Sequence, residues 1–413
     1  MAVLPTLLAA ADAFAGGSGV LDRPLSAERL IGLARRRAGL HDFGATPFLE
    51  PLRRLLTACV DEGELSLVGR LAVRWDTLRF LANLLHLRAA EMRTPALLNK
   101  PIERPIFITG LPRSGTTFLH RLMLEDPVSR APRVWQTIHP YPPHGADRSM
   151  RQVARQLRAF ERLAPEFRGL HPLTAGSPQE CSEIGAHVFR SLRFDTTYRI
   201  PSYRRWLDAD GLGPAYHFQR RFLQHLQRDT GHGRWVLKCP DHLFALAELR
   251  AAFPDARVVF VHRDPLSVLL SVAQLTEVLR RPFTRRVDPL YIGRQESARW
   301  LDGTARMIRA AREQPFAEPI CHVGYLELVT DPVATIARVY RHFGLELEAA
   351  TRERVARAVA EHPDGGYRHH AYRFADHGLD EAAEREKFAA YMHFFGIDAE
   401  RRRPALAPAS RAA

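Results

Sequence analysis

Apolar residues at helical spacing fill much of the first hundred residues, where strand-like alternation is absent. Two sets recur three or four positions apart: Leu52, Leu55, Leu56 and Cys59, then Leu78, Leu81, Leu84 and Leu85. Pro101 and Pro105 interrupt this pattern. The pattern predicts a helical N-terminal extension over about residues 1–100.

Short apolar runs beyond Pro105 predict strands that are buried on both faces. They lie at Ile106–Ile108, Trp235–Lys238, Val258–Val261 and Ile320–Tyr325. A helix is expected from about His242 to Phe253, between the second and third runs. Such strand–helix–strand units form parallel sheets. We therefore predict an α/β fold with three layers and a central, mainly parallel sheet over residues 101–397.

Helix starts and a long insertion complete the predicted organisation. Asp264-Pro265 and Asp331-Pro332 are typical of helix N-termini, because aspartate accepts from free N–H groups and proline has none to satisfy. A helical insertion of three helices is expected over about residues 145–232. The Arg/Pro/Ala-rich end, residues 398–413, is expected to be disordered.

Composition excludes several classes of protein. No apolar run reaches the roughly 18 residues of a membrane span, and the N-terminal stretch is interrupted by Pro5 and Asp12, unlike a secretion signal. The four cysteines are far apart and form no metal-binding cluster, so we expect no metal and reduced thiols in a cytoplasm.

The net charge of +13 comes from arginines that are dispersed along the chain, which argues against nucleic-acid binding. The sequence leaves homo-oligomer formation open.

The junction between Ile106–Ile108 and the following helix predicts an anion site. Small residues separate the strand from Phe118 and Leu119, which begin an apolar helical face. Such a turn directs backbone N–H groups and the positive helix end at one point. The Gly110 to Gly115 spacing matches a nucleotide-triphosphate loop, but Thr116 stands at the lysine position.

Two motifs together resemble the sulfotransferases that use 3'-phosphoadenosine 5'-phosphosulfate (PAPS). PRSGTT, residues 112–117, is similar to the 5'-phosphosulfate loop of that family. The resemblance implies that this donor is bound by Arg113, Ser114, Gly115, Thr116 and Thr117. In VVFVHRDPLSVLLS, Arg263 and Ser271 match the family's 3'-phosphate motif, an arginine at a strand end and a serine eight residues later.

The resemblance is to the broad bacterial sulfotransferase family and runs from about residue 28 to 397. It implies transfer of a sulfuryl group from PAPS to a hydroxyl group of a small-molecule, lipid or sugar acceptor. The alternative is a P-loop kinase or another nucleotide-binding protein, which would prefer ATP with magnesium. A turn that binds no ligand is the simplest alternative for the loop alone.

The residues that act on the acceptor are less defined than those for the donor. Arg113 and Lys238, which ends the strand in WVLKCPDH, are candidates to stabilise charge on the transferred group. Related bacterial members commonly carry Trp-Glu where this chain has Trp135-Gln136, and glutamine cannot accept a proton. The candidate general bases are therefore Glu180, placed first, and His139, His171 and His242.

Overall fold

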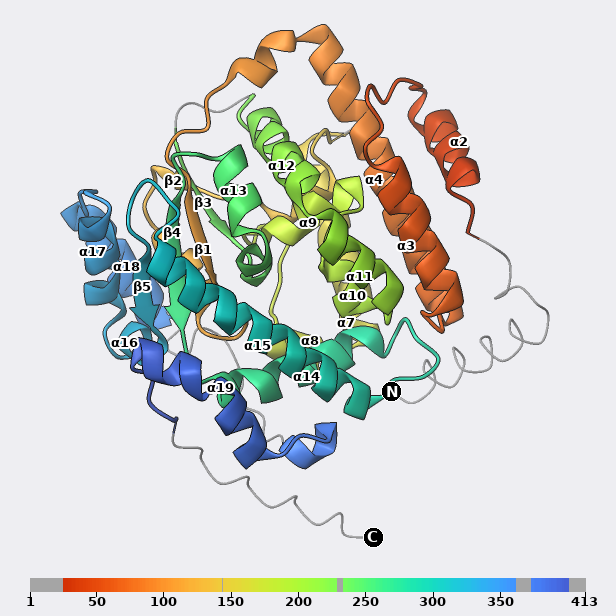
Figure 1. Cartoon of the computed structure of the whole chain (residues 1–413). Coiled ribbons are helices and arrows are strands. Elements are labelled where there is room, and N and C mark those ends of the chain that lie inside the picture. Colours follow the sequence, from red (N-terminus) through yellow and green to blue (C-terminus); the bar gives the residue numbers. More distant parts are fainter. Residues whose placement is uncertain (1–24, 143, 229–232, 362–372, 401–413) are drawn as a thin grey trace.

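A computed structural model describes residues 25–142, 144–228, 233–361 and 373–400. Its centre is a five-stranded sheet in the order β2-β3-β1-β4-β5, in which every neighbouring pair is parallel (Figure 1). The strands are β1 Ile106–Gly110, β2 Ser129–Arg130, β3 Arg234–Lys238, β4 Arg257–His262 and β5 Cys321–Gly324. In the middle strand, Phe107 pairs with Leu237 of β3 and Val258 of β4. The predicted α/β fold with a parallel sheet is confirmed.

Alternating side chains of β1 pack into different helical layers. Ile106 and Ile108 are fully buried against α5 (Thr116–Met123), α17 (Pro332–His342) and α18 (Ala349–Glu361). Phe107 faces the opposite layer, which includes α12 (Gly213–Leu226), α13 (Leu246–Ala252), α14 (Pro265–Arg280) and α15 (Pro289–Glu313). Burial on both faces explains why these strands are continuous apolar runs.

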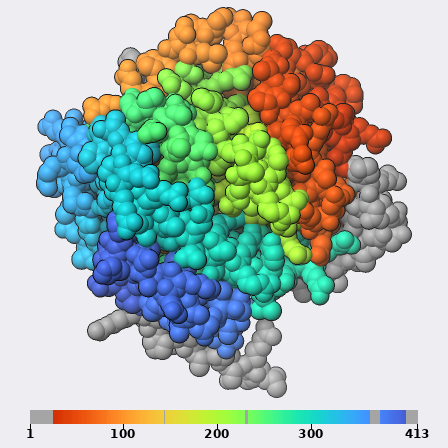
Figure 2. Space-filling view, in the orientation of Figure 1, coloured from red at the N-terminus to blue at the C-terminus, as the bar shows by residue number. Residues whose placement is uncertain are grey.

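The N-terminal helices are α2 (Ala27–Ala38), α3 (Leu49–Asp61) and α4 (Leu67–Arg93). Their buried leucines join the same hydrophobic core as Phe107 and the insertion. Figure 2 shows these red and orange helices lying directly against the yellow-green insertion. The domain boundary near residue 100 stays a prediction, because one core spans it.

The insertion contains more helices than the three expected. They are α7 (Ala146–Leu163), α8 (Phe167–Leu170), α9 (Cys181–Gly185), α10 (Arg193–Thr197), α11 (Pro201–Asp210) and α12; the short α6 (Val134–Ile138) precedes the insertion. Pro201 and Pro214 each stand in the first turn of a new helix, which divides the apolar pattern. The helical spacing of Cys181, Ile184, Val188 and Phe189 predicts one continuous helix, and this prediction is wrong. α9 ends at Gly185, a 3₁₀ turn follows over Ala186–Val188, and Phe189 adopts a left-handed φ of 55°.

Two further sequence predictions needed correction. The helix expected from His242 to Phe253 is a 3₁₀ turn, η4 (Pro240–Phe244), followed by α13, because Ala245 between them has a non-helical backbone (φ −148°, ψ 41°). The strand expected to reach Tyr325 ends at Gly324, and α16 (Tyr325–Thr330) begins there. By contrast, Asp264 and Asp331 cap α14 and α17 as predicted, accepting from the N–H groups of Leu266 and Ala334.

The chain closes with α19 (Glu381–Phe395), which packs against α14 and α15. Shorter 3₁₀ turns lie at η2 (Pro95–Asn99) and η5 (Phe374–His377). Of the expected disordered tail, residues 401–413 lie outside the described residues, whereas 398–400 are described. Within the described ranges, no helix is long and apolar enough to cross a membrane.

Candidate active site

The loop between β1 and α5 has the backbone of an anion cradle. Gly110 has a φ of 138°, and a Cβ there would lie 2.3 Å from the carbonyl oxygen of Val261 on the neighbouring strand. Gly115 (φ 93°) and Arg113 (φ 62°) are also left-handed, and the Ser114 hydroxyl donates to the Leu111 carbonyl at 2.6 Å. This turn ends at the N-terminus of α5, where free N–H groups favour a bound anion.

The two motifs predicted from sequence meet in space. Arg113 Nε donates to Ser271 Oγ at 2.9 Å across 158 positions of sequence. Arg263 Nη1 donates to the Arg113 carbonyl at 2.7 Å. Parallel strands end at one sheet edge, so the loop after β1 and the start of α14 after β4 are brought together.

Arg263 has two neighbours that the sequence motifs did not indicate. Its guanidinium carbon lies 3.8 Å from the ring centroid of Tyr325. Its Nε and Nη2 donate to the Glu400 carboxylate at 2.7 and 2.8 Å. Tyr325 follows β5 directly, so its position at the same sheet edge could have been predicted from the sequence. Glu400 could not, because its segment has the composition of a disordered tail.

Lys238, at the end of β3, is buried and paired with Glu180. Glu180 is the N-cap residue of α9, but its side chain makes no capping bond and contacts the Lys238 ammonium. Burial alone would raise the pKa of Glu180, but Lys238 and the nearby His171 outweigh it and the pKa is lowered. A carboxylate with a lowered pKa is a weak proton acceptor.

A cavity of about 1890 Å³ joins the donor motifs to a largely apolar chamber. Arg113, Thr116, Thr117, Arg263 and Ser271 line one part of it. Apolar side chains from α4, α7, α8 and α14 line another part, among them Leu71, Trp75, Leu157, Phe160, Leu163, Phe167, Leu275, Leu279 and Phe283, which follows α14. The donor motifs therefore open directly onto an apolar space.

The candidate histidines have different positions relative to this cavity. His171 lines it, and burial lowers its pKa to about 4, so the imidazole is neutral at pH 7. Among the residues that the structure describes, His139 and His242 are not part of the cavity wall. His242 Nδ1 is instead hydrogen-bonded to the buried Tyr216 hydroxyl at 2.6 Å. The sequence alone could not separate these histidines, because each lies near a predicted loop or strand end.

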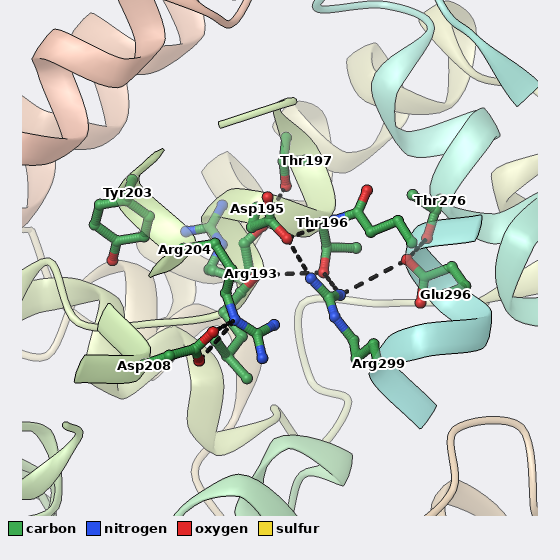
Figure 3. Close-up of polar contacts among 12 residues, drawn as sticks. Arg193, Asp195, Thr196, Thr197, Tyr203, Arg204, Asp208, Thr276, Glu296 and Arg299 are labelled. Atoms are coloured by element: carbon green, nitrogen blue, oxygen red, sulfur yellow. Dashed lines mark hydrogen bonds and ion pairs between the residues drawn. The ribbon is translucent and has the colours of Figure 1, made fainter. Parts of the chain in front are cut away.

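A buried polar cluster that the sequence did not reveal forms another part of the wall. Arg299 of α15 pairs with Asp195 of α10 and approaches Glu296, which accepts from the Thr276 hydroxyl at 3.1 Å (Figure 3). Glu296, Arg299 and Thr276 line the cavity. Asp241, just beyond the end of β3, also lines it. No sequence signal linked these residues, because the cluster joins three separate helices.

Comparison with known proteins agrees with this fold and site. Residues 105–349 match the model of the sulfotransferase family. The omega-hydroxy-beta-dihydromenaquinone-9 sulfotransferase Stf3 of Mycobacterium bovis is 25% identical over 279 residues, 63% of this chain and 68% of that protein. The crystal structure of the sulfotransferase STF1 of Mycobacterium tuberculosis H37Rv is 31% identical, with a TM-score of 0.77 over 88% of this chain and 98% of that one. STF9 of Mycobacterium avium is 29% identical, with a TM-score of 0.80 over 91% and 98% of the two chains.

The chain belongs to the sulfotransferase family. It is an enzyme that transfers a sulfuryl group from PAPS to a hydroxyl acceptor, as the two sequence motifs predicted. The kinase alternative is thereby set aside.

Proposed function

We propose that the anion cradle holds the 5'-phosphosulfate of PAPS and that Arg263 and Ser271 bind its 3'-phosphate. The support is the contact between the motifs: Arg113, inside the cradle, donates to the Ser271 hydroxyl, and its carbonyl accepts from Arg263. PAPS carries a 3'-phosphate and a 5'-phosphosulfate, so one molecule can contact both of these neighbouring motifs. Charge-assisted bonds from arginine to phosphate are among the stronger polar contacts in proteins.

In sulfuryl transfer, negative charge gathers on the oxygen that bridges sulfur and the 5'-phosphate. In our proposal, Arg113, the N–H groups at Thr116 and Thr117 and the buried Lys238 stabilise that charge. Glu180 holds the Lys238 ammonium.

Within the part of the chain that the structure describes, no group of three or more His, Cys, Asp or Glu side chains is arranged to hold a metal. We propose that the cationic side chains stabilise the charge on the bridging oxygen without a metal ion. Full activity after exhaustive treatment with a chelator is the expected result.

We propose that the acceptor is an apolar alcohol or phenol whose body fills the chamber. The observation that carries this proposal is the row of leucine and phenylalanine side chains next to the donor motifs. Deep apolar pockets favour apolar ligands, because each buried methylene contributes about 0.8 kcal/mol. Stf3, whose name gives a menaquinone derivative as acceptor, is a relative with an apolar substrate.

The experiment is a transfer assay with radiolabelled PAPS and a panel of apolar alcohols, phenols and free sugars. Label in the apolar acceptors is the expected result, and preferential labelling of the sugars would overturn the acceptor assignment. Stabilisation of the fold by 3',5'-ADP above that by ATP with magnesium tests the donor assignment separately.

We further propose a cytoplasmic enzyme, since its four cysteines are buried and unbridged.

A further inference from the structure

We propose that Asp241 is the general base, the catalytic residue that takes the proton from the acceptor hydroxyl. This inference rests on the proposed function of the cavity and adds the group that activates the acceptor. No sequence motif pointed to Asp241; the candidate bases predicted from the sequence were Glu180 and three histidines.

Among the residues that the structure describes, six carboxylates line the cavity: Asp76, Glu180, Glu183, Asp241, Glu296 and Glu400. Five of them are engaged. Asp76 and Glu183 pair with Arg79 and Arg193, Glu180 with Lys238, Glu296 with Thr276 and Trp300, and Glu400 with Arg263. Asp241 alone makes no side-chain hydrogen bond or ion pair with any residue that the structure describes. It is therefore the carboxylate in this wall that is available to a ligand.

Asp241 also lies beside the phosphosulfate loop. It follows Lys238, Cys239 and Pro240 at the end of β3. The Cys239 N–H donates to the Ile108 carbonyl at 3.2 Å, and the Thr109 hydroxyl donates to the Pro240 carbonyl at 3.2 Å. Ile108 and Thr109 are the β1 residues just before the loop, so Asp241 is anchored at the base of the donor site.

Burial gives Asp241 the basicity that proton transfer from the acceptor requires. Burial raises its pKa to about 6; Arg299 and Arg204 oppose this shift, whereas Glu180 and Glu296 add to it. A base whose pKa lies close to the working pH is both ionised and able to accept a proton. His171 also lines the cavity, but with a pKa lowered to about 4 it is the weaker base.

The proposed step is balanced in atoms and charge. The acceptor oxygen forms a bond to sulfur while the bond between sulfur and the bridging oxygen of the 5'-phosphate breaks. The acceptor proton passes to the Asp241 carboxylate. The products are a sulfate monoester and 3',5'-ADP, and Asp241 then releases its proton to solvent.

The test compares an acceptor that needs a base with one that does not. Dodecanol must lose its proton during transfer, whereas 4-nitrophenol is already largely ionised in mildly alkaline buffer. Asp241→Asn should lower kcat on dodecanol by roughly 10²- to 10⁴-fold, the usual range for general-base catalysis. Its kcat on ionised 4-nitrophenol should stay within about tenfold of the wild type, since no proton is transferred to a base. A merely structural role would lower both rates alike.

Three measurements complete the design. Stabilisation by 3',5'-ADP should be retained in Asp241→Asn, which shows that the variant is folded. The fall in the wild-type rate on dodecanol below a pH of about 6 should be absent from the residual activity of the variant. Asp302→Asn, which removes an exposed carboxylate paired with Arg306, should behave as the wild type.

The outcomes distinguish this inference from the function on which it rests. If the wild type binds 3',5'-ADP but sulfates neither probe, the proposed acceptor class fails and the base assignment falls with it. If the wild type sulfates dodecanol and Asp241→Asn does so equally well, or loses both acceptors to the same extent, only the base assignment is overturned. An acceptor-dependent loss on replacing His171 instead would transfer the role to that histidine.

Discussion

Arg263 donates two hydrogen bonds to Glu400, from Nε at 2.7 Å and from Nη2 at 2.8 Å. The Glu400 N–H also donates to the Asp264 carboxylate at 3.0 Å. The Glu400 carboxylate thus occupies the edge of the guanidinium that we assign to the 3'-phosphate of the donor. The nucleotide must displace Glu400 to reach Arg263 in this way.

Glu400→Gln should therefore tighten binding of 3',5'-ADP. The pair is only partly buried, so its loss is expected to be worth about 1 kcal/mol, or roughly five- to tenfold in Kd. Isothermal titration calorimetry measures the effect. Glu327→Gln, which removes the similar but exposed pair with Arg338, is the matched control and should leave Kd unchanged. Weaker binding by Glu400→Gln would mean that Glu400 supports the site instead of competing for it.

Arg263→Ala should weaken donor binding more than it slows transfer at saturating PAPS. The 3'-phosphate is remote from the reacting sulfur, so its contacts are equal in the ground and transition states. The expected loss is about 2 kcal/mol or more in donor affinity. Steady-state kinetics in PAPS measures it. An unchanged KM for PAPS with a reduced kcat would contradict the assignment of Arg263.

Lys238→Met should have the opposite signature, a reduced kcat with donor affinity nearly kept. The ammonium is proposed to act on charge that develops only during transfer, and removing one such group costs about 3 kcal/mol. Lys238→Met alone would leave the Glu180 carboxylate buried without its partner and so lower stability. The double variant Lys238→Met/Glu180→Gln removes both charges, so its kcat reports the catalytic role of Lys238 without this loss of stability. Restored stability with restored activity in the double variant would contradict a catalytic role for Lys238.

Asp241→Asn should stabilise the folded protein in neutral and alkaline solution while it lowers activity. Its folded pKa of about 6 lies above the ordinary value near 4, so ionisation costs stability as pH rises through this interval. Above it, the neutral asparagine should gain about 1 to 2 kcal/mol, a figure reduced to allow for partial solvent contact. Below pH ~4 the variant and wild type should unfold alike. Chemical denaturation across this range checks the sign.

The apolar chamber predicts a dependence on acceptor length. Across a series of primary alcohols, each added methylene should lower KM by about fourfold until the chamber is filled, because it contributes about 0.8 kcal/mol. Phe160→Asp, which puts a charge in the chamber wall, should weaken this trend without changing the Kd of 3',5'-ADP. A KM independent of chain length would show that the acceptor binds elsewhere.

The donor side of the site was predictable from sequence for a physical reason. Gly110 ends β1, Arg113 lies in the loop just after it, and Arg263 follows β4 directly. Parallel strands place their carboxyl ends at one sheet edge. Local sequence therefore sufficed to predict that these residues would lie close together. The caps at Asp264 and Asp331 were also predictable from local sequence, because an aspartate followed by proline is typical of a helix N-terminus.

The acceptor side depends on contacts that no local pattern contains. The pairing of Lys238 with Glu180 spans 58 positions, and Arg299 and Asp195 are 104 apart. Both pairs join the insertion to the sheet or to α15, and the insertion proved to have more and shorter helices than its apolar pattern indicated. Asp241 is likewise recognised as the carboxylate available to a ligand only because the other carboxylates of the cavity wall are paired. Those pairs can be seen only in the three-dimensional structure.

Sulfuryl transfer to an apolar alcohol can be measured by following radiolabelled sulfur from PAPS in the presence of the purified protein and dodecanol. Label should appear in the alkyl sulfate in step with formation of 3',5'-ADP, and Arg113→Ala should abolish both. Label that stays in PAPS, or that moves to free sugars in preference to the alcohol, would contradict the proposed acceptor site.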